Sequence, residues 1–395
     1  MSVQIKSKRI SSIDILRGLV MVIMALDHVR DYFHYGALVS DPTDLETTTP
    51  FLFMTRFVTH FCAPVFIFLT GTSASLYGQN KSKKELSKFL FTRGLWLIIV
   101  EIVLMNFLWW FDPSYSFINL QVIWAIGVCM LFLAVIIYLP YNIIIVLSLV
   151  IVFGHNMLDN IVFEGKSFGA ILWYIFHQAK FLPLENQRMV AFYYPVLPWI
   201  AVMALGYCFG FLYRKGSDQQ RRKTFLLILG ISSITLFLLI RFLNIYGDMV
   251  PWTPQKNDLF TFLSFMNVSK YPPSLLFLLI TIGPTFLVLY LLEDVQSKFT
   301  DVLLVFGRVP FFYYVLHIFI IHAAALITLF LLGKDWSLMI FGPESFTTNK
   351  MAENGYSLGV VYLVWILVVV FLYPLCKKYM AYKLNNPKKW WLSYL

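Results

Sequence analysis

Long apolar segments recur along the chain of 395 residues and alternate with shorter polar segments. An α-helix needs about 20 apolar residues to cross the hydrocarbon core of a bilayer, and these segments have that length. Because their hydrophobicity is continuous rather than alternating from residue to residue, they are not strands of a membrane β-barrel. The pattern predicts an all-α polytopic membrane protein with about ten transmembrane helices, at residues 13–35, 51–77, 88–110, 118–139, 141–158, 192–213, 224–245, 272–292, 309–332 and 358–380. The aromatic stretch 168–182 is too short to span, and we expect it to be interfacial or re-entrant.

Composition agrees with this prediction, because 59% of the residues are hydrophobic and only 13% are charged. A soluble domain averages nearer to a quarter charged residues, so a disordered chain and an ordinary cytosolic enzyme are excluded. The net charge is +10, and basic residues gather in every second connecting segment, for example at 81–93 and 214–223. Cytoplasmic loops of membrane proteins carry such an excess. We therefore expect both termini in the cytoplasm, no nucleic-acid partner, and a single transmembrane domain over residues 1–395.

The first apolar segment is unusual because it contains charged residues, which are costly inside a bilayer and are functional candidates for that reason. Asp14 and Arg17 are three residues apart on one helix face and are expected to pair. Arg17 and His28 are eleven residues apart, which places both side chains on one helix face, separated by about 16 Å along the axis. Asp31 lies one turn beyond His28 and is expected to orient its imidazole. This helix thus offers a cation that binds anions and a titratable base on one face.

Further polar residues lie on other predicted spans. Arg56 and His60 are four residues apart on the second span, at the depth expected for His28. Glu101 is expected to pair with Arg93 or Arg56. Together these residues predict a polar cavity among the helices, open to the outside, to which we also assign Asn106, Gln121, His317 and His322. The four cysteines lie in apolar stretches and form no CxxC pair, so we expect neither a metal site nor a disulfide.

Two neighbouring motifs near the start of the chain are distinctive. Residues 9–19 read Arg-x-x-Ser-Ile-Asp-x-Leu-Arg-Gly-Leu, and residues 24–31 read Met-Ala-Leu-Asp-His-Val-Arg-Asp. Further stretches of the same kind lie at 63–72, 120–127, 197–200, 206, 306–317 and 390–395. With these motifs the chain resembles, over essentially its whole length, the bacterial branch of the heparan-alpha-glucosaminide N-acetyltransferase catalytic-domain family.

The resemblance implies a transmembrane acetyltransferase. Acetyl-CoA, as the cosubstrate, would bind from the cytoplasm, and its acetyl group would pass to an amino or hydroxyl group of a sugar or glycan on the other side. The arginine–ten residues–histidine spacing also resembles the motif of bacterial membrane O-acyltransferases, which implies acyl-CoA binding by Arg17 and catalysis by His28. In the lysosomal members the proposed histidine lies in the following loop, where His34 is the nearest counterpart here, so both histidines stay open as the catalytic residue. We assign donor binding to Asp14, Arg17, Arg93 and Gln121, and catalysis to His28, Asp31, His34, Arg56 and His60.

A transporter that uses the same polar cavity is the alternative function. No internal repeat is visible, however, which weakens this alternative. The expected partners are acetyl-CoA, a sugar or glycan acceptor and the lipid bilayer, and the resemblance allows a homodimer. The extra luminal region of the lysosomal members is missing from this sequence, so we expect the protein in a bacterial cytoplasmic membrane.

Overall fold

The computed structural model describes residues 10–37, 39–348 and 353–393. Arg9 and residues 394–395, which belong to the motifs quoted above, lie outside the described residues. Most of the described chain is helical. The helices are α1 (Ser11–Phe33), α2 (Pro50–Thr59), α3 (Cys62–Gly78), α4 (Lys83–Val100), α5 (Asn106–Trp110), α6 (Val122–Ile136), α7 (Tyr141–Gly154), α8 (Phe168–Phe176), α9 (Leu197–Phe209), α10 (Gln219–Leu243), α11 (Asp258–Met266), α12 (Leu275–Leu292), α13 (Lys298–Arg308), α14 (Pro310–Leu331) and α15 (Leu358–Asn385).

Each of the ten expected segments contains a helix, but not all of these helices meet the requirements for a membrane span. Within the described residues, seven helices are long and apolar enough to cross a membrane. Two others, α6 and the helix over Leu197–Tyr213, are apolar but shorter. The charged residues of α1 keep it outside the group of seven. The structure therefore confirms an all-α polytopic membrane protein, while length and composition alone do not establish the count of ten.

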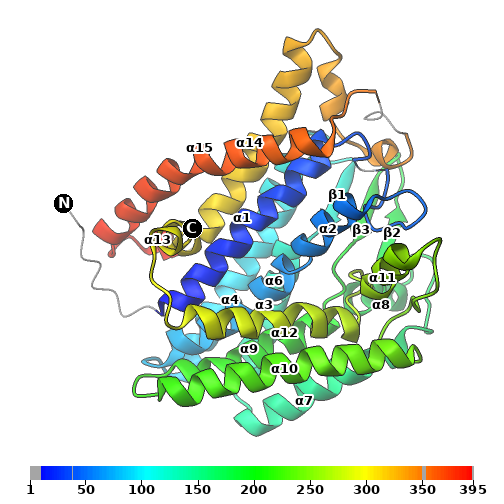
Figure 1. Ribbon diagram of the computed structural model, residues 1–395. Coiled ribbons are helices and arrows are strands. Elements are labelled where there is room, and N and C mark those ends of the chain that lie inside the picture. Colours follow the sequence, from blue (N-terminus) through cyan, green and yellow to red (C-terminus); the bar gives the residue numbers. More distant parts are fainter. Residues whose placement is uncertain (1–9, 38, 349–352, 394–395) are drawn as a thin grey trace.

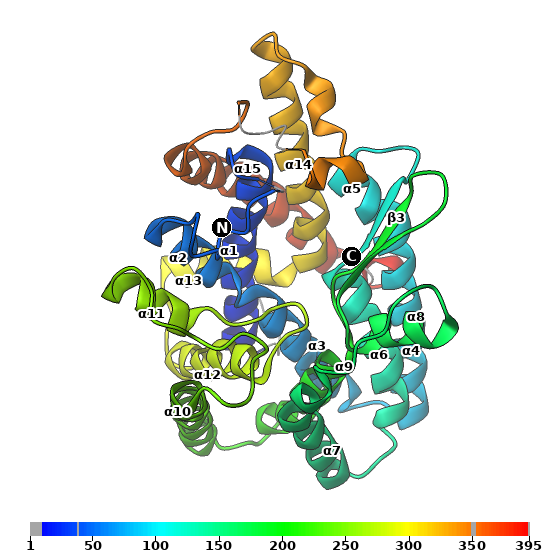
Figure 2. The same ribbon diagram turned by 90° about the vertical axis from the view of Figure 1, so that its right-hand side faces the viewer.

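Helix α1 runs through the middle of the bundle, between α14 and α15 on one side and α3 and α12 on another (Figures 1 and 2). Most of its residues are buried, including Asp14, Asp27, His28 and Arg30. Its charged groups consequently face other helices rather than lipid, which is how charges are tolerated within a membrane domain.

Glycines allow α1 and α13 to pack with their backbones in contact. A Cβ atom on Gly18 would lie 1.8 Å from a backbone carbonyl oxygen of α13, and one on Gly307 would lie 1.7 Å from a carbonyl oxygen of α1. Gly71 and Gly206 bring α3 and α9 together in the same way, with corresponding distances of 1.9 and 2.1 Å. Small residues permit this close approach of helices in membranes. All four glycines lie in the motif stretches, so helix packing explains part of those motifs.

The second expected span is interrupted. Helix α2 ends at Thr59 and α3 begins at Cys62. Pro64 has no N–H to donate to the carbonyl of His60, four residues earlier, so a continuous helix would lose that hydrogen bond. Arg56 and His60 nevertheless lie one helical turn apart, as predicted from their spacing, because the His60 backbone N–H donates a hydrogen bond to the Arg56 carbonyl at 3.1 Å. Pro50–Gly78 as a whole remains long and apolar enough to cross a membrane.

A small sheet lies beside the helices at one end of the bundle (Figure 2). It contains β1 (Phe117–Leu120), β2 (Lys180–Pro183) and β3 (Met189–Phe192) in the order β1-β3-β2, with β1 parallel and β2 antiparallel to β3. The stretch 168–182 forms α8 and leads into β2, and so it belongs to this non-spanning region. Before β1, burial raises the pKa of Asp112, but hydrogen bonds from Ser114 and Ser116 outweigh this effect and hold the pKa below its usual range.

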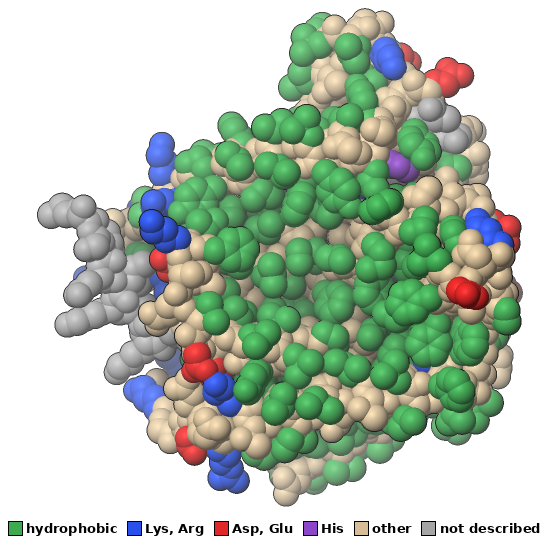
Figure 3. Space-filling view, viewed as in Figure 1, with side chains coloured by type: hydrophobic (Ala, Val, Ile, Leu, Met, Phe, Trp, Pro, Cys, Tyr) green, Lys and Arg blue, Asp and Glu red, His purple; other side chains and the backbone are tan. Residues whose placement is uncertain are grey.

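The surface shows the distribution expected for a membrane protein. Hydrophobic side chains cover the middle of the face seen in Figure 3, while Lys and Arg side chains gather along its left edge. This edge is the end at which α1 begins and α15 ends (Figure 1). Charged side chains appear again near the opposite edge. A broad apolar band between two charged borders matches a bilayer with water on both sides.

Candidate active site

A cavity of about 1300 Å³ follows α1 through the protein. We call one end of it the basic end, lined by Arg17, Arg308, Lys383 and Lys389. We call the other the polar end, lined by Asp31, Tyr193, Lys270 and Tyr271. His28 lines the cavity between the two ends. The structure therefore contains a cavity beside α1, and Arg56 and Gln121 line it as predicted. The other residues that we assigned to this cavity are not among the described residues that line it: His60, Glu101, Asn106, His317 and His322.

At the basic end, Arg17 is held in place by three groups. It donates hydrogen bonds to the Asp14 carboxylate at 2.9 Å, to the Ser73 hydroxyl at 2.8 Å and to the Gly307 carbonyl at 3.2 Å. Arg308 approaches the same carboxylate at 3.7 Å. The predicted Asp14–Arg17 pair is thus confirmed, and two guanidinium groups surround one buried carboxylate.

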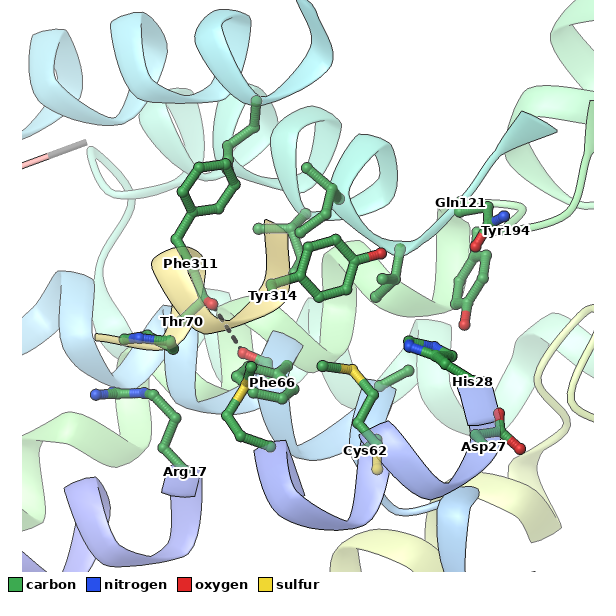
Figure 4. A pocket seen from close by; sticks show the side chains of 18 of the residues that line it. Arg17, Asp27, His28, Cys62, Phe66, Thr70, Gln121, Tyr194, Phe311 and Tyr314 are labelled. Atoms are coloured by element: carbon green, nitrogen blue, oxygen red, sulfur yellow. Dashed lines mark hydrogen bonds between the residues drawn. The ribbon is translucent and has the colours of Figure 1, made fainter. Parts of the chain in front are cut away.

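The section between Arg17 and His28 is mainly apolar. Phe66 and Cys62 of α3 lie between these two residues in the close view, with Phe311 and Tyr314 of α14 across from them (Figure 4). Two residues that we assigned to donor binding, Arg93 and Gln121, also line the cavity. The arrangement offers a path with cations at its entrance and apolar walls farther in.

His28 contacts a second histidine. Its Nδ1 lies 2.7 Å from Nε2 of His317 on α14, and the two rings are nearly parallel, with an interplanar angle of 19°. Trp109 packs edge-on against the His28 ring at a centroid distance of 4.7 Å. The prediction that Asp31 orients His28 is wrong, because the Asp31 carboxylate accepts a hydrogen bond from Arg30 at 2.7 Å and His317 occupies Nδ1 of His28.

A compact ion cluster lies next to His28. The Asp27 carboxylate contacts Arg30 at 2.6 Å and Arg56 at 2.5 Å, and it accepts a hydrogen bond from Thr59 at 2.8 Å. Arg56 lines the cavity, as predicted, but its guanidinium is also bound to Asp27. The cluster gives the wall beside His28 a fixed arrangement of charges.

His34 and His60 are not among the described residues that line the cavity. His34 accepts a hydrogen bond from the Gly36 backbone N–H at 3.1 Å. His60 packs against Phe277 at a ring-centroid distance of 5.4 Å. The structure therefore brings His28 into the cavity and leaves these two candidates outside it.

The prediction for Glu101 is also wrong. Its carboxylate accepts a hydrogen bond from the Trp124 backbone N–H at 3.3 Å, at the start of α6, rather than pairing with Arg93 or Arg56. A side-chain oxygen is a suitable acceptor at this position because the first N–H groups of a helix have no partner within the helix. Residues 101–105 form a π-helical turn, in which Asn106 bonds back to the carbonyl of Glu101.

The polar end contains aromatic side chains and one buried amine. Tyr271 packs against Tyr193 and Tyr194 at ring-centroid distances of 4.3 and 5.2 Å, and the Lys270 ammonium lies 5.0 Å from the Tyr271 ring centroid. Burial raises the pKa of the Tyr271 phenol, but Lys270 and Arg56 outweigh this effect and leave the pKa below its usual value. Lys270 could not be predicted from the sequence, because a lone lysine in a long loop gives no signal before the fold places it beside Tyr271.

Comparison with known proteins identifies the family. Residues 9–242 match the family described as heparan-alpha-glucosaminide N-acetyltransferase, catalytic. No curated protein matches the chain significantly. The match covers more than half of the chain and includes Arg17, His28 and Arg56, whereas Arg308, His317 and Lys383 lie beyond it. The chain therefore belongs to the heparan-alpha-glucosaminide N-acetyltransferase catalytic family, and this membership supports a transmembrane acetyltransferase-like role.

Proposed function

We propose that this protein transfers an acetyl group from acetyl-CoA at the basic end of the cavity to an amino or hydroxyl group of a sugar at the polar end. One observation carries the proposal: a single cavity joins a cluster of cations to His28 and continues to a polar chamber. The family match supports the reaction class. The whole chain forms the transferase unit in this proposal, because residues from Arg17 to Lys389 line the cavity.

The basic end suits the phosphate groups of CoA. Arg17, Arg308, Lys383 and Lys389 bring four cations to the cavity wall. Guanidinium groups bind phosphate oxygens through charge-assisted hydrogen bonds, and lysines add positive charge. The pantetheine arm would lie along the apolar section toward His28, about 16 Å from Arg17 along the helix axis. Arg93 offers a polar contact on the cavity wall, whereas Gln121 lies beside Tyr194, on the other side of His28 from Arg17 (Figure 4).

His28 is the general base of the proposed reaction. It takes a proton from the acceptor while the acceptor nitrogen or oxygen bonds to the thioester carbonyl carbon. The carbon–sulfur bond then breaks, and the proton passes from His28 to the sulfur of CoA. Arg56 lines the cavity near His28 and would stabilise the negative charge that develops on the carbonyl oxygen. His60 lies outside the cavity, so we no longer assign it a part in the chemistry.

The charge distribution supports a direction for the transfer. Basic side chains concentrate at the end where α1 begins, and cytoplasmic borders of membrane proteins carry such an excess. In this proposal the basic end and both termini face the cytoplasm, where acetyl-CoA is made, and the polar end opens to the other side. The aromatic side chains at the polar end, Tyr193, Tyr194 and Tyr271, offer stacking surfaces for a sugar ring.

The test uses detergent-purified protein and acetyl-CoA radiolabelled in the acetyl group, with and without glucosamine. We expect release of free CoA and label on the sugar with wild-type protein, and neither with His28→Ala. His60→Ala is the matched control, because His60 lies outside the cavity, and it should retain turnover. Full turnover by His28→Ala would refute the assignment of the base, whereas glucosamine binding without any consumption of acetyl-CoA would favour a transporter.

A further inference from the structure

We propose that His317 is a positioning residue that holds His28 in the tautomer whose Nε2 is unprotonated. The observation is the direct contact of the two rings, with 2.7 Å between Nδ1 of His28 and Nε2 of His317. Both side chains are buried, and His317 lies behind His28 rather than among the described residues that line the cavity. His317 therefore acts through His28 and does not contact the substrates.

The direction of this hydrogen bond follows from a backbone carbonyl. Nδ1 of His317 lies 2.9 Å from the carbonyl oxygen of Tyr313, which can only accept a hydrogen bond. His317 therefore carries its proton on Nδ1. Because a charged imidazolium is costly in this fully buried position, the ring is neutral and its Nε2 is an acceptor. His28 must then donate from its own Nδ1, which leaves its Nε2 with a free lone pair.

The other ring nitrogen of His28, Nε2, must be unprotonated for His28 to act as a general base. Within the described part of the chain, Nε2 of His28 has no hydrogen-bond partner, and the ring lines the cavity. When this nitrogen takes a proton, the bond from Nδ1 to His317 becomes charge-assisted and stronger. His317 thus stabilises the protonated base, in the role that a carboxylate has in a Ser-His-Asp triad. Unlike a carboxylate, a neutral histidine adds no charge to the membrane domain.

The inference rests on the proposed acyl transfer only where turnover is concerned, and one of its tests does not involve turnover. Diethylpyrocarbonate modifies unprotonated imidazole nitrogens, and the cavity gives it access to Nε2 of His28. The initial rate of His28 modification in detergent-purified protein, measured by peptide mass spectrometry, therefore reports the tautomer directly. Turnover, measured as CoA release at saturating acetyl-CoA, is the second readout.

Two substitutions separate the hydrogen bond from packing. His317→Phe keeps a planar ring next to Tyr313 but removes the acceptor, whereas His317→Gln retains an acceptor oxygen. The matched control is His322→Gln on the same helix, because the ring nitrogens of His322 face the carbonyls of Leu108 and Met339, at 2.9 and 2.7 Å, and not His28. Thermal unfolding of each variant shows whether it is folded, and His317→Leu replaces His317→Phe if the latter is not.

Without an acceptor, the Nδ1–H tautomer of His28 would bury an unpaired donor, so the tautomer equilibrium should shift toward Nε2–H by about 5- to 100-fold. We expect His317→Phe to slow both His28 modification and turnover by about that factor, with little change in the KM for acetyl-CoA. His317→Gln should restore most of both rates, and His322→Gln should leave the modification rate unchanged.

Unchanged modification of His28 in a folded His317→Phe variant would overturn the inference. Equal losses in His317→Gln and His317→Phe would also overturn it, because the acceptor would then be irrelevant. If His28 modification follows the prediction but wild-type protein releases no CoA, the positioning role stands and the proposed acyl transfer fails.

Discussion

Asp27 offers the sharpest test of the ion cluster beside His28. Its carboxylate contacts both Arg30 and Arg56 and accepts a hydrogen bond from Thr59. Asp27→Asn removes the charge while keeping the shape of the side chain. Arg56 then loses the carboxylate that it contacts, while Arg30 keeps its bond to Asp31.

The expected magnitude follows from burial. The side chains of Asp27, Arg30 and Arg56 are exposed by only 11%, 5% and 15%. Breaking a buried ion pair by removing one partner costs about 3–5 kcal/mol, because a buried charge is left uncompensated. Asp31→Asn is the matched control: the Asp31 side chain is 29% exposed and, in the described chain, its carboxylate forms an ion pair with Arg30 alone, so the loss of its charge should cost about 1 kcal/mol.

The assay is thermal unfolding of both variants in the same detergent, followed by tryptophan fluorescence. We expect Asp27→Asn to lower the unfolding midpoint several times more than Asp31→Asn does. The double variant Asp27→Asn/Arg56→Gln should recover part of the loss, because it leaves one fewer unpaired buried charge. Equal decreases of the unfolding midpoint in Asp27→Asn and Asp31→Asn would refute this reasoning. A double variant whose midpoint falls by the sum of the decreases in Asp27→Asn and Arg56→Gln would refute it as well.

Three further predictions concern the donor site, the helix contact and the turn before the sheet. Arg17→Gln should weaken binding of acetyl-CoA by about 10- to 100-fold in calorimetry, because it removes a charge-assisted contact to phosphate, and an unchanged Kd would count against this role. Gly307→Ala should destabilise the protein by at least about 1–3 kcal/mol, because its Cβ would lie 1.7 Å from a carbonyl oxygen, whereas Gly169→Ala, with no atom within 4 Å, should not. Because the folded-state pKa of Asp112 is lowered, its ionised form stabilises the fold above the unfolded-state pKa, and this contribution disappears as the pH falls through the folded-state pKa. The difference in unfolding midpoint between wild type and Asp112→Asn should therefore shrink from neutral to acidic pH, and a constant difference would contradict the prediction.

The sequence predicted features that depend on local spacing. The Asp14–Arg17 pair and the position of His28 on the cavity wall follow from the period of one helix, and both appear in the structure. The apolar runs likewise predicted helices at all ten segments. The two motifs at residues 9–19 and 24–31 indicated the family, and the match over residues 9–242 confirms this family membership.

Contacts between distant segments could not be predicted in this way. His317 is 289 residues from His28 in sequence, and only the packing of α14 against α1 brings the two rings together. The spacing of Asp31 suggested an orienting role, but the nearby Arg30 guanidinium takes its carboxylate instead. Likewise, only the fold brings Arg308, Lys383 and Lys389 to the basic end of the cavity together with Arg17.

Transfer of the acetyl group across the membrane is the central claim, and proteoliposomes test it most directly. Purified protein would be reconstituted with glucosamine trapped inside, and acetyl-CoA with labelled acetyl and CoA moieties would be added outside. Selective opening of vesicles would distinguish the two orientations of the protein. We expect the acetyl label on the trapped sugar while the CoA label stays outside, and no transfer with His28→Ala. Entry of the CoA label together with the acetyl label, or acetylation only when both substrates share one compartment, would contradict the account.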